Sequence, residues 1–195
     1  MKKLVFLFVF FQCFLVLAQE NAHEFQNNLN KKFATREESP LTDEDFKVFK
    51  TLEFYPINPK FIVEAKFIRT PKEKIFKMKT TTTRKPEYKK YGELIFQIDH
   101  KEFKLNVYQN IDLIKKDGYE DYLFLPFSDL TCGKESYIGG RYIDMRIPKT
   151  NSVTIDFNKA YNPYCAYNHK YSCPIVPLEN DLPIEVLAGV KKFHD

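Results

Sequence analysis

The residues that could do chemistry concentrate between Phe127 and Pro183, and this stretch contains two cysteines and a histidine at regular spacing. Cys165, His169 and Cys173 recur at every fourth position. Three soft ligands with an open coordination position would suit a catalytic zinc ion. The same spacing suits a disulfide between Cys165 and Cys173, or free thiols, and we expect the disulfide. Zinc is the lesser alternative because no second histidine or compact cysteine pair supports it, and no cofactor is predicted.

Two carboxylates and an arginine lie on neighbouring predicted strands. Alternation places Arg141 on the apolar face of residues 141–147, and it places Asp144 and Asp156 on the polar faces of their strands. If these strands pair, the two carboxylates share a face, where they could divide acid and base roles or hold a cation. The alternative is that both carboxylates only face solvent, on the exposed side of a half-buried sheet. The inward Arg141 needs a carboxylate of the chain or an anionic ligand as its partner.

The segment 158–167 has the composition of a ligand-recognition loop. Asn and Tyr are adaptable contact residues, and they are also ordinary loop-packing residues. Catalytic residues are not assigned, because P-loop, nucleophile-elbow and zinc-protease motifs are absent from the sequence. The candidate ligand-binding residues of the whole stretch are Arg141, Tyr142, Asp144, Asp156, Asn158, Tyr161, Asn162, Tyr167 and Asn180.

The N-terminal residues have the pattern of an export signal. Lys2 and Lys3 precede an apolar run, and Val16 and Ala18 have the spacing that signal peptidase prefers. We expect residues 1–18 to be a cleaved signal peptide and the protein to be secreted or periplasmic. The run is shorter than the roughly 20 apolar residues of a membrane span, so an uncleaved anchor is the lesser alternative and no stable membrane span is expected after cleavage.

Composition favours one domain with an aromatic core. The chain has 195 residues, 44% of them hydrophobic, with 19 Phe and 12 Tyr, which favour strands and bury large areas. The formal net charge is +4, and removal of Lys2 and Lys3 leaves +2. That bias is too small to indicate a nucleic-acid partner. A small-molecule ligand is a possible partner because of the inward Arg141 and the Tyr- and Asn-rich loop. Composition does not specify the oligomeric state.

The periodicity of the sequence predicts helices first and strands afterwards. Residues 19–50 are predicted to be helical, because apolar residues recur at helical spacing from Ala22 to Phe33 and Thr42 precedes three acidic residues as an N-cap. Beyond residue 60 the period changes to two. Strands are expected at 61–68, 74–79, 93–98, 102–107, 122–127, 141–147, 152–158 and 183–190, with a hairpin turn at 99–101. The predicted fold is therefore mainly β: a single antiparallel β-barrel or β-sandwich of about eight strands over residues 19–195, with one or two N-terminal helices.

The motifs of this region resemble a known family. They are Gly140-Arg141-Tyr142-x-Asp144, then Asp156-Phe157-Asn158-x-Ala160-Tyr161-Asn162-Pro163-x-Cys165-Ala166-Tyr167, and finally Cys173-Pro174-x-x-Pro177-x-Glu179-Asn180. They look like DUF1684, a bacterial and archaeal domain of unknown function, and the resemblance covers nearly all of the mature chain. It implies no activity or ligand. The fit is imperfect at residues 136–139. Cys132 does not belong to the pattern, which makes it the unpaired thiol.

These patterns lead to one functional expectation and two alternatives. We expect an exported binding or scaffold domain that meets a small polar or anionic ligand through residues 141–167. The first alternative is a hydrolase that uses Asp144 and Asp156, or a metal held by cysteine and histidine. The second is a protein partner for the N-terminal helix, if its apolar stripe is left undocked.

Overall fold

Both N-terminal helices begin where a side chain caps them. Helix α1 spans Ala22–Ala34 and helix α2 spans Asp43–Val48 in the computed structural model, which describes residues 21–194. Asn21 accepts a hydrogen bond from the amide of Glu24 at 2.9 Å, and Thr42 accepts one from the amide of Asp45 at 3.1 Å. These caps satisfy amides that have no partner within the helix. The predicted signal peptide lies outside the described residues.

The predicted helical stretch, residues 19–50, contains two separate helices, and α1 covers only its first part. It ends at Ala34, and Thr35 is already extended. The hydroxyl of Thr35 donates to the carbonyl of Lys31 at 2.9 Å, a local side-chain bond of the kind that competes with helix continuation. The apolar stripe is docked, with Ala22 and Phe33 buried, so the structure does not leave the helix as an undocked face.

The strands form one curved sheet. Within residues 21–194 it has eight strands in the order β6-β5-β4-β3-β1-β7, with β2 also paired to β3 and β8 to β5. Their bounds are β1 Ile62–Arg69, β2 Ile75–Lys77, β3 Glu87–Ile98, β4 Lys101–Asn110, β5 Tyr122–Asp129, β6 Arg141–Arg146, β7 Ser152–Asp156 and β8 Asp181–Leu182. The β5–β8 pair is parallel and the other pairs are antiparallel. The mainly β prediction with N-terminal helices is confirmed, but the sheet is a half-barrel and neither a closed barrel nor a sandwich.

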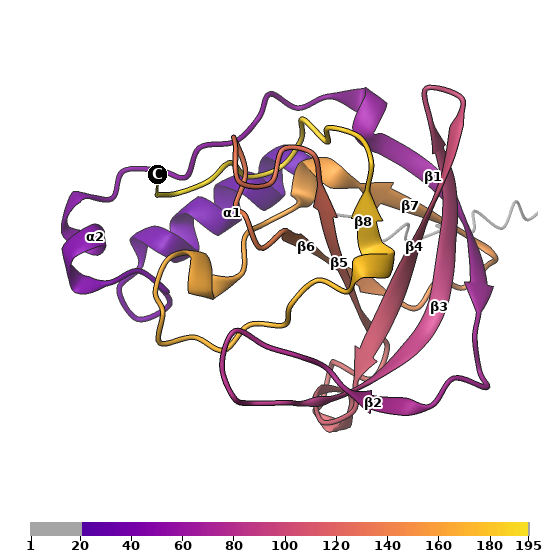
Figure 1. Ribbon diagram of the computed structural model, residues 1–195. Helices are drawn as coiled ribbons and strands as arrows, with labels where there is room; N and C mark the ends of the chain where they lie inside the picture. The colour runs from indigo at the N-terminus through magenta and orange to yellow at the C-terminus, as the bar shows by residue number, and fades with distance from the viewer. Residues whose placement is uncertain (1–20, 195) are drawn as a thin grey trace, which may run out of the picture.

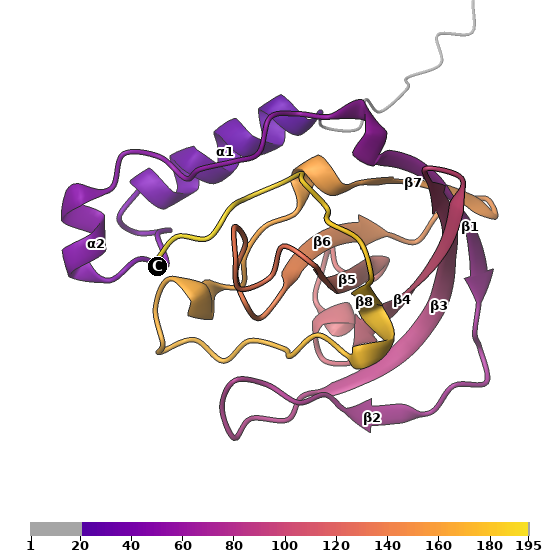
Figure 2. The ribbon, with the colours of Figure 1, turned by 45° about the horizontal axis from the view of Figure 1, so that its top comes forward.

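Figures 1 and 2 show both helices on one side of the molecule, away from the long β3 and β4. The C-terminal segment returns to the same side and ends near the helices. The turn between β3 and β4 is the predicted hairpin: Asp99 and His100 have φ of 50° and 61°, as the tight turns between antiparallel strands require. Among residues 21–194, no helix has the length and apolar character that crossing a bilayer would require.

The main core fills the concave side of the sheet. Leu105, Leu125, Phe127, Ile155 and Phe157 are fully buried there. A second apolar cluster joins Phe33 of α1 to the loops that carry Leu41, Leu52, Tyr167 and Val190. This second cluster anchors α1 against the loops that follow β7.

Residues 183–190 do not form the predicted strand. The alternation is present, because Val186 and Ala188 are buried while Glu185 and Leu187 are exposed. However, the backbone here bonds to charged side chains: the amide of Val186 donates to Asp129 at 2.6 Å, and its carbonyl accepts from Arg141 at 2.9 Å. Other backbone groups of the segment bond to separate parts of the chain: the carbonyl of Ile184 accepts from the amide of Leu130 at 2.9 Å, and the carbonyl of Gly189 accepts from the amide of Tyr55 at 2.9 Å.

The strands expected at 141–147 and 152–158 do not pair with each other, and that pairing was the condition for a shared face of Asp144 and Asp156. β6 pairs with β5, whereas β7 pairs with β1, with Asp156 opposite Ile62. Over residues 21–194 the strand order therefore puts β6 and β7 at opposite ends of the sheet. Asp144 and Asp156 do not share the face of one strand pair, which removes the basis for a two-carboxylate centre.

Candidate functional site: an aromatic pocket beside the N-terminal helix

Strand β5 is apolar on both faces, and this double character creates the site. On one face Leu125 and Phe127 pair with Ile143 and Arg141 and turn into the main core. On the other face Phe124 lies opposite Asp144, while Tyr122 and Tyr142 occupy alternate positions beside them. A strand that is apolar on both faces must be covered by other elements on both faces. Helix α1 and the loop after β7 provide the second cover.

The second face borders a pocket of about 640 Å³. This size is typical of small-molecule sites, which are usually apolar clefts with a few polar groups. The pocket is lined by Phe25, Asn28, Leu29 and Lys32 of α1, by Tyr88, Leu113, Tyr122, Phe124, Tyr142 and Asp144 of the sheet and its turn, and by Tyr161, Pro163, Tyr164, Tyr171, Ser172, Cys173 and Pro174 of the following loops.

Asp144 is the carboxylate of this pocket, and phenol groups hold it in place. The hydroxyl of Tyr122 donates to its Oδ1 at 2.7 Å, and the hydroxyl of Tyr161 donates to the same atom at 2.6 Å. Burial and then the charge of Asp144 raise the pKa of both tyrosines, so both hydroxyls stay protonated and act as donors. Asp144 itself remains exposed, so it stays accessible from the pocket.

Lys32 places a positive charge on the helical wall of the same pocket. Its ammonium group lies 5.4 Å from the centre of the Tyr164 ring, within the range of a cation–π contact. Burial lowers the pKa of Lys32, but a hydrogen bond with Tyr164 and the charges of Glu38 and Asp144 outweigh this and raise it overall. The pocket therefore presents a fixed carboxylate on its sheet side and a charged amine on its helix side.

The aromatic walls are tied to one another. The ring of Tyr142 meets Phe124 edge-on with centroids 4.7 Å apart and meets Tyr161 at 5.9 Å. The hydroxyl of Tyr142 donates to the carbonyl of Pro174, which binds the far loop to the sheet. Such contacts hold the rings in fixed orientations, so the pocket is formed without a ligand.

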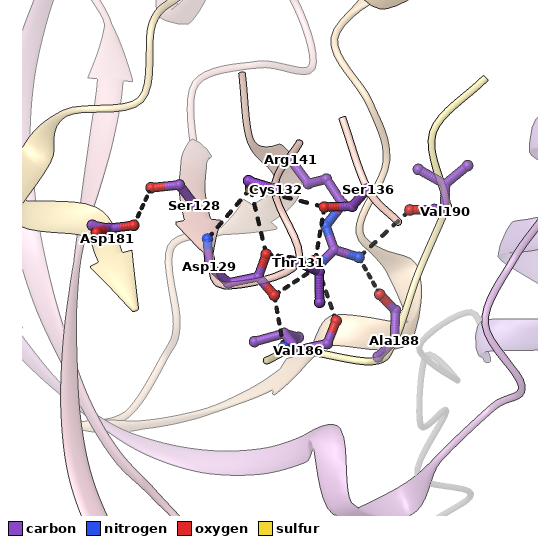
Figure 3. A network of polar contacts seen from close by, with 10 residues as sticks. All are labelled: Ser128, Asp129, Thr131, Cys132, Ser136, Arg141, Asp181, Val186, Ala188 and Val190. Carbon is purple, nitrogen blue, oxygen red and sulfur yellow. Dashed lines mark hydrogen bonds and ion pairs between the residues drawn. The ribbon is translucent and has the colours of Figure 1, made fainter. Parts of the chain in front are cut away.

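Arg141 lies on the other, core-facing side of β6. Its guanidinium donates to the carboxylate of Asp129 at 3.1 Å, and both side chains are 0% exposed. It also donates to the carbonyls of Val186 and Ala188, as Figure 3 shows. The inward orientation follows the alternation of the sequence. The partner is a carboxylate of the chain, and the enclosed guanidinium has no surface through which to meet a ligand.

The remaining predicted site residues support the loops. Asp156 caps the turn after β7 by accepting from the amide of Asn158 at 3.0 Å, and buried Asn158 donates to the carbonyl of Asn58 at 3.1 Å. Asn180 is buried and donates to the carbonyls of Asn106 at 2.9 Å and of Pro126 at 2.6 Å. Asn162 and Tyr167 are also buried away from the pocket, the former donating to the carbonyl of Lys191 at 2.9 Å and the latter in the cluster below α1. Of the candidate ligand-binding residues, Tyr142, Asp144 and Tyr161 line the pocket.

The cysteines are close in the structure but not bridged. All the cysteines of the described chain, Cys132, Cys165 and Cys173, are free thiols, so the predicted Cys165–Cys173 disulfide is not formed in this structure. The amide of Cys165 donates to Cys173 Sγ at 3.2 Å, which confirms that the two are neighbours. Within residues 21–194, no three His, Cys, Asp or Glu side chains form a group that could hold a metal ion.

Sequence reasoning missed the α1 wall and the β5 wall of the pocket. Tyr122 and Phe124 alternate on β5 with residues of the main core, and a strand apolar on both faces indicates cover on both faces. That signal was present in the sequence. The α1 residues gave none, because their spacing is equally typical of simple core packing.

The fold and the site define a class of protein: a β half-barrel with an aromatic pocket that an N-terminal helix walls. The chain belongs to the family described as "Protein of unknown function (DUF1684)", whose model matches residues 47–191. The expected resemblance is therefore confirmed, although the pocket wall on α1 precedes the matched region.

A solved structure shares this architecture. The solution NMR structure of the uncharacterised protein from gene locus rrnAC0354 of Haloarcula marismortui is 29% identical to this chain, with a TM-score of 0.67. The match covers 85% of this chain and 89% of that chain. Comparison with curated proteins finds no match.

Proposed function

We propose that the protein is exported and binds a small polar molecule in the aromatic pocket. The observation that carries the proposal is Asp144, a carboxylate positioned by the hydroxyls of Tyr122 and Tyr161 in a pocket of about 640 Å³. A polar acceptor that is fixed in an apolar pocket orients a ligand, because an unmatched polar group there would cost free energy.

The walls define the chemistry of this ligand. The rings of Phe124, Tyr142 and Tyr161 offer flat apolar surface, so the ligand has an apolar face or ring. A hydroxyl or amine on it donates to Asp144. An anionic group on it meets Lys32, whose ammonium is on the opposite wall, because Arg141 is enclosed.

A screen against the mature chain tests the proposal. The probes are monosaccharides, primary amines and small carboxylic acids, and the readout is the shift of the thermal midpoint followed by calorimetric titration of each hit. Asp144→Asn keeps the shape of the carboxylate and removes its charge. Loss of one charged hydrogen bond weakens binding by about 10- to 100-fold.

The matched control is Asp117→Asn, which makes the same change at an exposed turn that does not line the pocket. It is expected to leave the dissociation constant unchanged. Equal affinities for the wild type, Asp144→Asn and Lys32→Gln would overturn the assignment of the pocket, and a screen without hits would overturn the ligand class.

Export has a separate test. The proposal rests on Lys2, Lys3, the apolar run after them, and the spacing of Val16 and Ala18. Expression of the full chain is expected to release a protein whose mass is that of a chain beginning at Gln19. A chain that stays inside the cell with its first 18 residues intact would contradict export without touching the pocket.

A further inference from the structure

Cys165 and Cys173 form a thiol pair that the ligand pocket does not explain. Cys165 lies in a short 3-10 turn, Tyr164–Ala166, and the chain then turns back to bring Cys173 beside it. The amide of Cys165 donates to Cys173 Sγ at 3.2 Å. Thr81 holds the second cysteine: its hydroxyl accepts from the amide of Cys173 at 3.1 Å, and its own amide donates to the carbonyl of Cys173 at 2.9 Å.

The two sulfurs have different surroundings. The hydroxyl of Tyr137 lies 3.8 Å from Cys165 Sγ. A hydrogen bond from the Cys173 thiol, joined by bonds from Tyr137 and Thr81, lowers the pKa of Cys165 to about 6 against the opposing effect of burial. The same shared proton, together with burial, raises the pKa of Cys173. The two thiols titrate as a pair, and these hydrogen bonds favour the thiolate on Cys165.

Each cysteine also borders a separate hollow. Cys165 lines a hollow of about 580 Å³ with Tyr137, His169 and Phe193, whereas Cys173 lines the aromatic pocket. The two residues are 5% and 7% exposed, and a small molecule can approach Cys165 from the hollow that it shares with Tyr137 and His169. This arrangement resembles the order of an attacking and a resolving thiol, since only a thiolate attacks a disulfide.

We propose that Cys165 and Cys173 are a redox-active dithiol that exchanges with low-molecular-weight disulfides, with Cys165 as the attacking sulfur. The Cys165 thiolate attacks one sulfur of R–S–S–R, forms a mixed disulfide and releases RS⁻. Cys173 then loses its proton to this RS⁻, and its sulfur attacks Cys165 Sγ and releases the second RS⁻. Two electrons pass to the substrate, which becomes two thiol or thiolate products, and the cysteines become a disulfide.

Cys132 is the internal comparison. It is half-buried and faces the Asp129 carboxylate, and burial followed by this charge raises the pKa of its thiol. A cysteine that stays protonated reacts slowly with disulfides. The proposal therefore concerns the pair alone and does not depend on the ligand of the aromatic pocket.

The test uses the whole mature chain carrying Cys132→Ser and glutathione disulfide as the probe. Mass spectrometry after acid quenching and alkylation is expected to show a Cys165–Cys173 disulfide, which reduced glutathione converts back to two thiols. Adding Cys173→Ser is expected to trap one glutathione on Cys165. Adding Cys165→Ser instead is expected to slow glutathione attachment about tenfold at pH 7, because burial still raises the pKa of Cys173 and keeps it in the thiol form.

Three results would overturn the proposal: no disulfide in excess glutathione disulfide, a disulfide that reduced glutathione leaves intact, or equal attachment rates in the two serine variants. The first result would mean an unreactive thiol pair, and the second would mean a structural disulfide. If a serine variant does not fold, the test uses the Cys132→Ser chain with both Cys165 and Cys173 in place. The measurement is then the pH dependence of Cys165 alkylation. Half-maximal reaction near pH 6 supports the proposal, and a profile centred above about pH 8, as for an ordinary thiol, contradicts it.

Discussion

Replacing Asp129 with alanine removes the acceptor at the centre of a buried polar network. Its carboxylate accepts from the Arg141 guanidinium at 3.1 Å, from the amide of Val186 at 2.6 Å and from the hydroxyl of Thr131 at 2.8 Å. Figure 3 shows these groups converging from β5, β6 and the C-terminal segment. In the variant, Arg141 keeps its charge at 0% exposure with backbone carbonyls as its remaining partners.

Breaking a buried ion pair from one side costs about 3–5 kcal/mol, because the other charge stays buried and unpaired. The whole free energy of unfolding of a domain is about 5–15 kcal/mol, so this loss is a large part of it. For a domain of this size it corresponds to a fall in the thermal midpoint of roughly 6–20 °C. The loss is expected to reach the C-terminal segment first, since Asp129 and Arg141 hold its backbone.

Urea titration followed by far-ultraviolet circular dichroism measures the effect, and it suits a chain without Trp. The control is Asp181→Ala, which removes an exposed carboxylate that accepts from Ser128 at 2.7 Å and is expected to cost less than about 1 kcal/mol. Combining Asp129→Ala with Arg141→Met is expected to recover part of the loss, because the unpaired charge is gone. If Asp129→Ala costs no more than Asp181→Ala, the reasoning about the buried pair is refuted.

Two further predictions concern backbone geometry and alkaline pH. Gly140 and Gly118 have φ of +82° and +80°, but a Cβ on Gly140 would lie 2.5 Å from the carbonyl oxygen of Phe127, whereas at Gly118 the space is open. In urea titration Gly118→Ala is therefore expected to cost about 1–2 kcal/mol and Gly140→Ala clearly more, and equal costs would contradict the close approach. Burial raises the pKa of Tyr55 and of Tyr108 to about 12. Because the unfolded chain loses these protons near pH 10, the free energy of unfolding is expected to fall as pH rises from about 10 toward 12, and Tyr108→Phe is expected to reduce the fall. A urea midpoint independent of pH over this range would count against it.

Local patterns predicted much of the fold. Thr42 caps a helix at the position that its N-cap signal indicates, and the turn at Asp99 and His100 follows from two adjacent strands with a short polar connection. These features involve residues close together in the chain. Their energies depend little on the rest of the molecule, so a reader of the sequence can assign them.

Partners distant in the chain were predicted less well. Consecutive strands often pair, but β7 lies against β1 and β6 against β5. Residues 183–190 alternate as a strand does, yet their backbone bonds to Asp129 and Arg141. Alternation specifies which side chains turn inward and not which group accepts the backbone hydrogen bonds.

In the candidate site, too, the sequence indicated some residues and the tertiary structure supplied the others. The sequence indicated Tyr142, Asp144 and Tyr161 as contact residues, and the structure brings them together with Tyr122 and the α1 wall. It also indicated that Cys165 and Cys173 are neighbours, but the free thiols and their unequal environments come from the surrounding loops.

By itself the sequence determined the mainly β class, the capped helices, the membership of the family and the inward direction of Arg141. Periodicity and capping are short-range properties, so they can be read along the chain. Only the tertiary structure decided that Asp129 pairs with Arg141, that Asp144 and Asp156 lie on different strand pairs, and that α1 walls an aromatic pocket. These outcomes depend on which distant surfaces bury each other, and that choice is made by the packing of the whole chain.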